Sequence, residues 1–368
     1  MDKERRKKIL DAALVPVLAI ISGLVVASFL VLLTDAPPLE AYKTLFAAGF
    51  GCKSFDSCAL VATLERATPL ILTGLSALVA FRSGIFSLGQ EGQMMLGAIM
   101  AAWLGYQIQL PGIIHPIVII LAAMAIGGAY GYIPGVLKVK LGVNEIISTI
   151  MLNEIAILIL EWVVNFPLRA DQAATAHSFT IHKSAWLMTF LPKSKWGIGF
   201  VLAILAACIV YIYLTRTSAG YEQRMAGQAP RFAKFGGILN EKVAIRSMIL
   251  SGALAGMAGA IEVLGVHHRI MTGFSTNLGF DGLSVAILGQ SSPIGVVIVA
   301  ILFAGIRIGA QLGLQIRLGI PRELGGSIIS LIILFVAADQ LFLDGMGGVG
   351  KLRDKIMAKF KKPIGGDS

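Results

Sequence analysis

Long apolar runs separated by short polar turns make up most of the chain. A helix needs about 20 apolar residues to cross the hydrocarbon core of a bilayer. Runs near this length lie at 13–33, 60–81, 84–105, 113–135, 144–165, 197–214, 242–264, 293–311 and 324–343. A further run at 280–290 is too short to cross, and we interpret it as half of a broken helix. The pattern predicts an all-α, polytopic membrane protein with about ten transmembrane helices, some of them broken.

Composition supports this prediction. Hydrophobic residues make up 56% of the chain and charged residues 14%, and the mean hydropathy is +0.80. A typical soluble domain has about 25% charged residues. The chain therefore lacks the polar surface that a soluble enzyme, a disordered protein or a small disulfide scaffold would need.

The basic residues predict how the chain is oriented in the membrane. The net charge is +10, and 15 of the 31 Lys and Arg residues cluster at the two ends and in one internal segment. Cytoplasmic loops are enriched in Lys and Arg, so the tails 1–12 and 344–368 and the segment 215–241 are predicted to be cytoplasmic. Residues 166–196 then form an external loop of one transmembrane domain, 13–343. No basic groove interleaved with aromatic residues is present, so we expect no nucleic acid as a partner.

The internal basic segment contains one candidate helix. Pro230 suits the first position of a helix, and residues 230–236 would form a short amphipathic helix on the membrane surface. Because so short a helix is weakly favoured by itself, a solvated loop is the alternative.

Signals for enzymatic activity are weak. GMGGVGKL at 345–352 resembles a phosphate-binding loop, but Leu352 stands where Mg²⁺ coordination needs Ser or Thr, and no strand precedes it. The pair His267-His268 lacks the Cys/His cluster of a zinc site, and no nucleophile has a nearby base. We expect a chain that is not an enzyme and binds no metal or cofactor.

The three cysteines divide between two environments. Cys208 lies in an apolar run and is expected to pack as a small hydrophobic residue. Cys52 and Cys58 flank a short polar stretch in a loop predicted to be external. A disulfide between them is possible in an oxidising compartment, and the spacing leaves free thiols equally open.

Polar residues within the apolar runs are the strongest functional candidates, because burying them in hydrocarbon is costly. They are Glu91, Gln93, Asn144, Glu145, Ser148, Asn153, Asn277 and Asp281. They either line a substrate pathway or form hydrogen bonds that hold the helices together. For Glu91 the pathway is favoured, whereas Asn144 and Glu145 could instead cap their helix.

Three motifs resemble those of a known family. Three segments occur in the order and spacing of bacterial ABC-importer permeases of the nucleoside and simple-sugar branch: AFRSGIFSLGQEGQMMLGA at 80–98, LKVKLGVNEIISTIMLNEIA at 137–156 and GFDGLSVAILGQSSPIGVVIVAILFAGIRIGA at 279–310. The resemblance covers nearly the whole chain. It departs at Ser87-Leu88, where the family has Asn-Ile, and at Ala229, where it has Asn.

The resemblance implies partners and further site residues. A permease of this branch has ten helices and lies in the bacterial inner membrane. It pairs with a second permease, cytoplasmic ABC ATPases that use ATP and Mg²⁺, and an external binding protein or lipoprotein. Phe86 and Ser87 join the predicted pathway residues. The residues that match the family's ATPase-coupling segment are Arg224, Gly227, Pro230, Arg231, Phe232 and Gly236.

The predicted function is ATP-driven import of nucleosides by alternating access. Simple sugars of the ribose or galactose type are the alternative within the family, and riboflavin-like compounds a more distant one. A different class also stays open, a solitary ion-coupled secondary carrier in which Glu91, Glu145 and Asp281 relay protons.

Overall fold

The computed structural model describes residues 37–52, 58–170, 176–191, 194–274, 277–289 and 292–320, with a few residues within 25–32 and 326–331. These residues form helices joined by loops, and the only strand pairing among them consists of isolated bridges. This confirms the predicted all-α class. The basic tails, the motif at 345–352 and most of the runs 13–33 and 324–343 lie outside the described residues.

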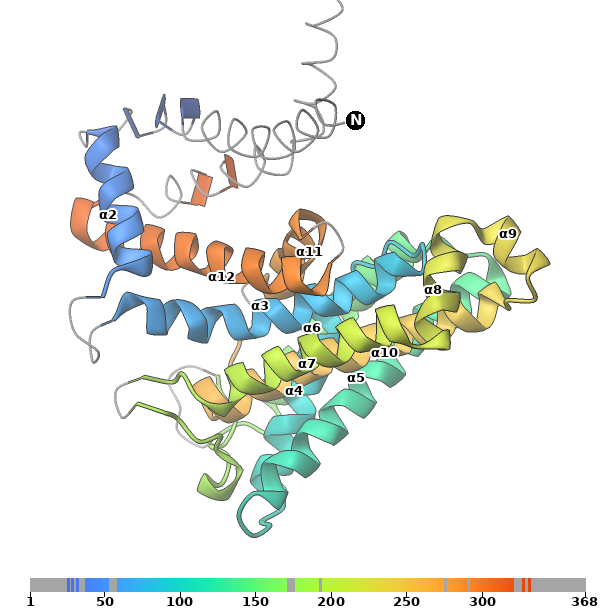
Figure 1. Ribbon diagram of the computed structural model, residues 1–368. Coiled ribbons are helices and arrows are strands. Elements are labelled where there is room, and N and C mark those ends of the chain that lie inside the picture. The colour runs from blue at the N-terminus through green and yellow to red at the C-terminus, as the bar shows by residue number, and fades with distance from the viewer. Residues whose placement is uncertain are drawn as a thin grey trace, which may run out of the picture. The chain divides into compact units, whose positions relative to one another are not determined.

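The chain divides into two compact units. One consists of Met1–Ala48 and Gly309–Ser368, and the other of Gly49–Ile308. In the first unit the described residues belong mainly to helix α2 (Pro38–Phe50) and the π-helix η4 (Ala310–Arg317). The second unit carries all the predicted site residues, and its helices α3 to α11 are labelled in Figure 1.

Six helices in the described part of the chain are long and apolar enough to cross a membrane. They are α3 (Ala59–Arg82), α5 (Ile114–Leu141), α6 (Glu145–Asn165), α7 (Ile198–Arg216), α10 with η3 (Asn240–His267) and α12 with η4 (Pro293–Arg317). Helix α11 (Leu278–Leu288) has 11 residues and is too short to cross, as the sequence predicted. A total of ten spans and cytoplasmic termini stay predictions.

One helix begins later than predicted. The run at 84–105 forms helix α4 from Gln90 to Gln107, and the preceding residues 83–89 are not helical. Gly84 has a φ of +77°, which ends α3 in a left-handed turn. In this turn the Ile85 N–H donates to the carbonyl of Ala80 at 3.3 Å. The apolar pattern continues through this turn, which is why it did not reveal the break.

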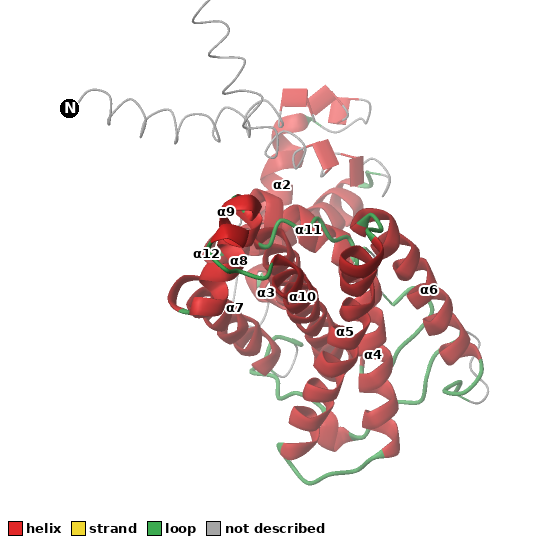
Figure 2. Cartoon of the chain, turned by 90° about the vertical axis from the view of Figure 1, so that its right-hand side faces the viewer, coloured by secondary structure: helices red, strands yellow, loops and turns green. Residues whose placement is uncertain are grey.

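Helix α10 forms the centre of the second unit, packed against α3, α4 and α5 (Figure 2). Small residues allow this contact, because a Cβ at Gly127 of α5 would lie 2.3 Å from the carbonyl oxygen of Gly252 of α10. In the apolar windows of α3 and α10, 78% and 72% of residues are buried, against 33% and 28% in α6 and α7. Helices α6 and α7 therefore present apolar side chains outward.

The two ends of α10 differ in structure. At its first residue lie α8 (Ser218–Gln228) and α9 (Pro230–Phe235), which we call the α8–α9 end. At the other end, the described residues 166–170, 176–191 and 194–197 fold over 263–274, and we call these segments the capped end. The Ser178 N–H donates to the Ile270 carbonyl at 2.8 Å, and the Leu187 N–H to the Leu264 carbonyl at 3.0 Å. At 1.5 Å per residue, the two ends are separated by roughly 40 Å.

Candidate functional site

Buried polar side chains gather where the non-helical segment 83–89 enters α4. Ser87, Glu91 and Asn153 are each 2% exposed or less. Asn153 of α6 donates to the Leu88 carbonyl at 2.7 Å and accepts the Gly92 N–H at 2.9 Å. Both hydrogen bonds satisfy backbone groups that the break in the helix leaves open. Asn153 therefore holds the segment in place, which is the helix-bonding role that the sequence left open.

A second α6 side chain supports the same segment. The Thr149 hydroxyl accepts the Leu88 N–H at 3.2 Å and donates to the Glu145 carbonyl. Thr149 is completely buried. It lies one turn before Asn153 in the motif that carries the family resemblance, and this helical spacing is the signal that sequence reasoning missed.

Glu91 connects α4 to the short helix α11. Its Oε2 accepts the backbone N–H of Gly279 at 2.6 Å, in the first turn of α11. The carboxylate thereby compensates the positive end of the helix dipole and a backbone donor that has no partner within the helix. This contact joins α4 directly to the start of α11.

The start of α11 is also held by an ion pair. Asp281 pairs with Arg307 of α12, a residue that sequence reasoning missed although it is a lone cation in an apolar run. Asn277 precedes α11 with a φ of +63° and is exposed. The structure therefore brings Glu91, Asn277 and Asp281 together around one helix start.

Three other predicted pathway residues lie beside this cluster. Gln93 is buried, and its Oε1 has no hydrogen-bond partner among the described residues. The Ser87 hydroxyl accepts the Gly89 N–H at 3.3 Å. Phe86 is 41% exposed and stacks on Phe81 with ring centroids 4.8 Å apart.

The remaining predicted pathway residues lie at the start of α6. Asn144 caps the helix by accepting the Ile146 N–H at 2.9 Å, and Glu145 forms an ion pair with Lys138 at the end of α5. The Ser148 hydroxyl donates to the Glu145 carbonyl at 3.2 Å. Each of these three side chains therefore has a partner within the protein. That any of them touches a substrate stays a prediction.

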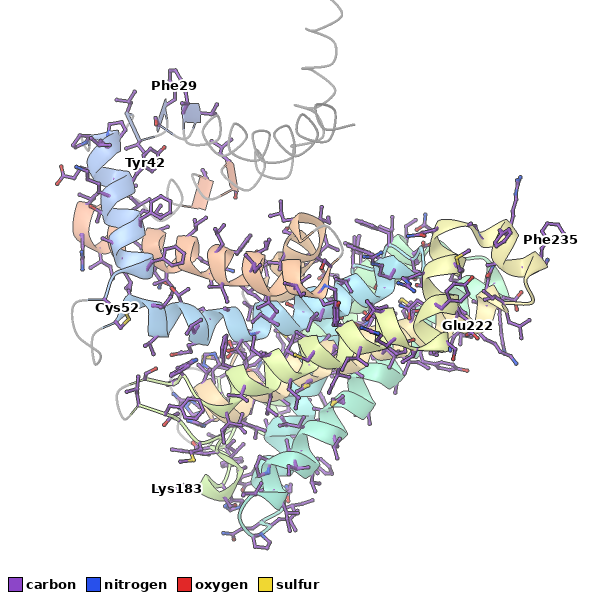
Figure 3. All side chains as sticks on the ribbon, viewed as in Figure 1. Phe29, Tyr42, Cys52, Lys183, Glu222 and Phe235 are labelled. Atoms are coloured by element: carbon purple, nitrogen blue, oxygen red, sulfur yellow. A yellow bond between two sulfur atoms is a disulfide. The ribbon has the colours of Figure 1, made fainter. Side chains whose placement is uncertain are left out.

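The helix predicted at 230–236 is present as α9, with Pro230 at its first position. Phe232 is 66% exposed and Phe235 92% exposed, and Figure 3 shows Phe235 pointing away from the helices. Between α8 and α9 lies a groove of about 240 Å³. Tyr221, Met225, Phe232 and Gly236 are among the residues that line it.

Helix α8 was not predicted, although the Thr217 hydroxyl caps it by accepting the Gly220 N–H at 3.0 Å. Its Gly227 packs directly on the end of α3, because a Cβ there would lie 2.5 Å from the Arg82 carbonyl oxygen and 2.8 Å from the Gly84 nitrogen. Buried Gln223 donates to the Val79 carbonyl at 2.5 Å. Helix α8 is therefore attached to the turn that leads into the segment 83–89.

Basic side chains accompany the exposed aromatic residues of the α8–α9 end. Arg231 is exposed and Arg224 is half-buried. The only ion pair in which a described residue of α8 or α9 takes part joins Glu222 to Arg246 of α10, at 3.3 Å. An exposed, basic and aromatic surface of this kind suits a protein partner.

The cysteines follow the sequence analysis in part. Cys52 and Cys58 are joined by a disulfide, with Cα atoms 4.1 Å apart. Cys208 is exposed, so the expectation that it packs as a small hydrophobic residue was wrong. Helix α7 buries one face, with Ala203, Ala207 and Val210, and Cys208 lies on the other.

One family model and several known proteins are similar to this chain. Residues 59–337 match the family model described as branched-chain amino acid transport system, permease component. The chain is 35% identical to the guanosine ABC transporter permease protein NupP of Bacillus subtilis, over 94% of this chain and 98% of that protein. It is 31% identical to the nucleoside ABC transporter permease protein NupB of Lactococcus lactis, over 88% and 90%. It is 27% identical to the glucose ABC transporter permease protein TsgB13 of Haloferax volcanii, over 89% and 87%. No solved structure matches the chain.

Proposed function

Because this chain belongs to the permease-component family of branched-chain amino acid transport systems, we propose that it is the membrane subunit of an ABC importer that carries nucleosides. The observation that carries the substrate class is the similarity to NupP and NupB over almost their whole lengths. The family description names branched-chain amino acids as the substrate. Because one fold can serve many substrates, we infer the substrate from NupP and NupB instead.

We assign the α8–α9 end to the cytoplasm and the capped end to the outside of the inner membrane. The exposed Phe232 and Phe235 and the basic Arg231 form the docking surface for a separate ATPase chain that uses ATP and Mg²⁺. A second permease subunit and an external binding protein or lipoprotein complete the transporter. ATP hydrolysis and ligand capture are then functions of those partners.

The contacts described above suggest how the ATPase acts on the pathway. Movement of α8 reaches the turn at Gly84 through Gly227, and Asn153 and Thr149 hold the following segment to α6. Glu91 then passes the displacement to the start of α11. Alternating access would follow if α11 takes two positions relative to α4. Phe86, Ser87, Glu91 and Gln93 are the residues that we expect beside the substrate.

The test is uptake into vesicles that contain the reconstituted transporter with its own binding protein and ATPase. We expect ATP-dependent accumulation of labelled guanosine or uridine, and no accumulation of ribose or glucose. Uptake of a sugar but not of a nucleoside would contradict the substrate class. Uptake by the chain alone, driven by an ion gradient, would contradict its role as an ABC subunit.

A further inference from the structure

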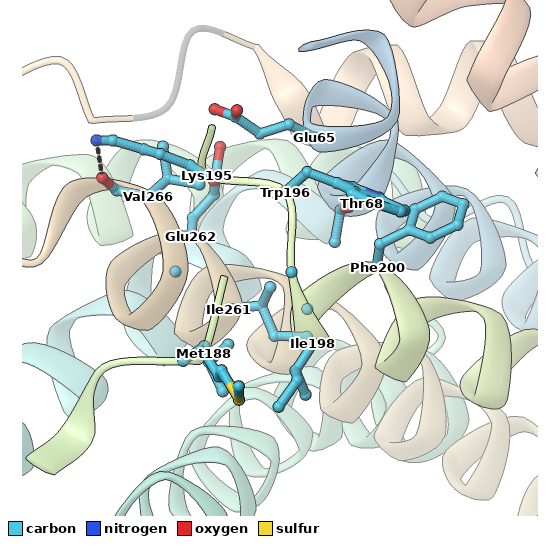
Figure 4. Close-up of a pocket in the computed structure, with 14 residues that line it drawn as sticks. Glu65, Thr68, Met188, Lys195, Trp196, Ile198, Phe200, Ile261, Glu262 and Val266 are labelled. Carbon is cyan, nitrogen blue, oxygen red and sulfur yellow. Dashed lines mark hydrogen bonds between the residues drawn. The ribbon is translucent and has the colours of Figure 1, made fainter. Parts of the chain in front are cut away.

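A small pocket at the capped end contains two carboxylates that the proposed pathway does not use. Glu65 of α3 and Glu262 of α10 line it, together with Thr68, Lys195 and Trp196 (Figure 4). The pocket has room of about 20 Å³ for a small guest, which suits a single water molecule. A nucleoside is far too large for it.

Glu262 is the unusual residue of this pocket. It is 3% exposed and lies in the last turn of a membrane-spanning helix. Among the described residues, neither Glu262 nor Glu65 takes part in an ion pair. The Lys195 ammonium group donates instead to the carbonyl of Val266. An ionised carboxylate in this position would be buried without a direct partner, which is strongly unfavourable.

The charged groups around Glu262 do not remove this cost. Arg66 and Glu65 of α3 and Lys195 of the loop before α7 act on it electrostatically, and His267 follows it on η3. The two basic neighbours attract an ionised Glu262 and the acidic neighbour repels it, and none of the three forms a hydrogen bond with its carboxylate. The pocket also contains a second unpaired polar group, because the buried Nε1 of Trp196 has no partner among the described residues.

We propose that Glu262 is a proton-binding site. Its carboxyl group is neutral while Lys195 is bound to the Val266 carbonyl, and one water lies in the pocket between this carboxyl group and the Trp196 indole. A proton needs a single carboxylate lone pair. A metal ion would need several ligands, and no three His, Cys, Asp or Glu side chains gather to hold one in the described part of the chain. The ligand is therefore a proton taken from solvent.

Proton loss would change the contacts of Lys195. In the structure its ammonium group holds the loop before α7 to Val266, one turn beyond Glu262. An ionised Glu262 offers this ammonium group a stronger acceptor than a carbonyl oxygen. Release of the proton would therefore move Lys195 off Val266 and loosen the loop that walls the pocket.

Infrared difference spectroscopy of the full chain in lipid nanodiscs tests the site without a transport assay. We expect the carbonyl stretch of a protonated carboxylic acid at about pH 7, where an ordinary glutamate is ionised. The band should be lost in Glu262→Gln and unchanged in Glu161→Gln, a matched control whose carboxylate is exposed on α6. Absence from the wild-type spectrum of any band that Glu262→Gln removes would overturn the proposal.

Two further measurements keep the proposal testable if Glu262→Gln folds poorly. In Glu65→Gln, loss of the neighbouring negative charge should make Glu262 ionise at lower pH, so the band should disappear at lower pH than in the wild type. Replacement of sodium by choline at fixed pH should leave the band unchanged. A response to sodium instead of pH would mean that a metal cation occupies the pocket, and would overturn the assignment of a proton. Failure of nucleoside uptake would not affect any of these results.

Discussion

The α8–α9 end and the capped end differ in how their aromatic residues are packed. At the α8–α9 end, Phe232 and Phe235 are exposed. At the capped end, Trp186 stacks on His268 with ring centroids 3.9 Å apart, and Tyr106 stacks on Phe179 at 4.6 Å. Aromatic side chains left in solvent are costly unless a partner covers them. The exposed Phe232 and Phe235 therefore suit a partner, whereas at the capped end several aromatic rings stack on one another and Phe166 is exposed.

Titratable groups follow the same division. All five histidines of the chain lie at the capped end or at the adjoining start of α5: His115, His177, His182, His267 and His268. The basic side chains of α8 and α9 are instead Arg224, Arg231 and Lys234. A change of pH therefore has histidines to act on at the capped end, whereas the proposed docking at the α8–α9 end rests on basic side chains and exposed apolar surface.

The strongest test of this comparison is Gly227→Val at the α8–α9 end. The added side chain meets the backbone of Arg82 and Gly84, and overpacking of this kind costs about 1–3 kcal/mol. Because α8 must separate from the turn, we expect nucleoside uptake to fall by about 10- to 100-fold. Gly265→Ala at the capped end is the control, since a Cβ there has no neighbour closer than 3.7 Å. Equal uptake by both variants would show that the contact between α8 and the turn at Gly84 passes no movement to the pathway.

A second test removes the support of the segment between α3 and α4. Asn153→Ala deletes two hydrogen bonds to the backbone and should lower the free energy of unfolding by about 2 kcal/mol. Thermal unfolding in detergent measures it. Asn165→Ala, which removes one exposed hydrogen bond on the same helix, should change stability by less than about 0.5 kcal/mol. Similar losses in the two variants would contradict the structural role of Asn153.

A third test concerns the exposed aromatic residues directly. Phe235→Ala should weaken binding of the purified ATPase by about 10-fold, because a central aromatic anchor contributes about 1–2 kcal/mol. Phe166 of the capped end is 72% exposed, so Phe166→Ala is the control and should leave ATPase binding unchanged. Surface plasmon resonance with the transporter in nanodiscs measures both. If Phe166→Ala weakened binding and Phe235→Ala did not, the assignment of the two ends would be reversed.

The smallest expected effect is a pH dependence at the capped end. Burial, and secondarily the charge of Lys195, lowers the pKa of His268, so the folded chain binds a proton there less readily than the unfolded chain. This contribution to stability is complete above about pH 6.5 and is lost as the pH falls through the lowered pKa. His268→Asn keeps a residue that tolerates the left-handed backbone and should be less destabilised by acid, by less than about 1 kcal/mol. Thermal unfolding at two pH values would detect the difference, and identical acid sensitivity would contradict it.

Much of the fold could be predicted because apolar run length directly reports membrane-spanning helices. The runs at 60–81, 144–165 and 197–214 correspond within two residues to α3, α6 and α7, and Pro230 marked the start of α9. The prediction failed where hydrophobicity carries no signal. The break at 83–89 and the start of α8 depend on Gly84, Thr217 and local backbone geometry.

The sequence by itself determined the helical class, the membrane environment, the family, and which polar residues are costly enough to require an explanation. Only the tertiary structure decided what those residues do. It placed the Glu91 carboxylate on the Gly279 N–H, paired Asp281 with Arg307, and put Glu65 and Glu262 in one pocket. Each of these pairs joins residues far apart along the chain. Periodicity reports which face of a helix is buried but not which neighbour it meets, and that neighbour decides the chemistry.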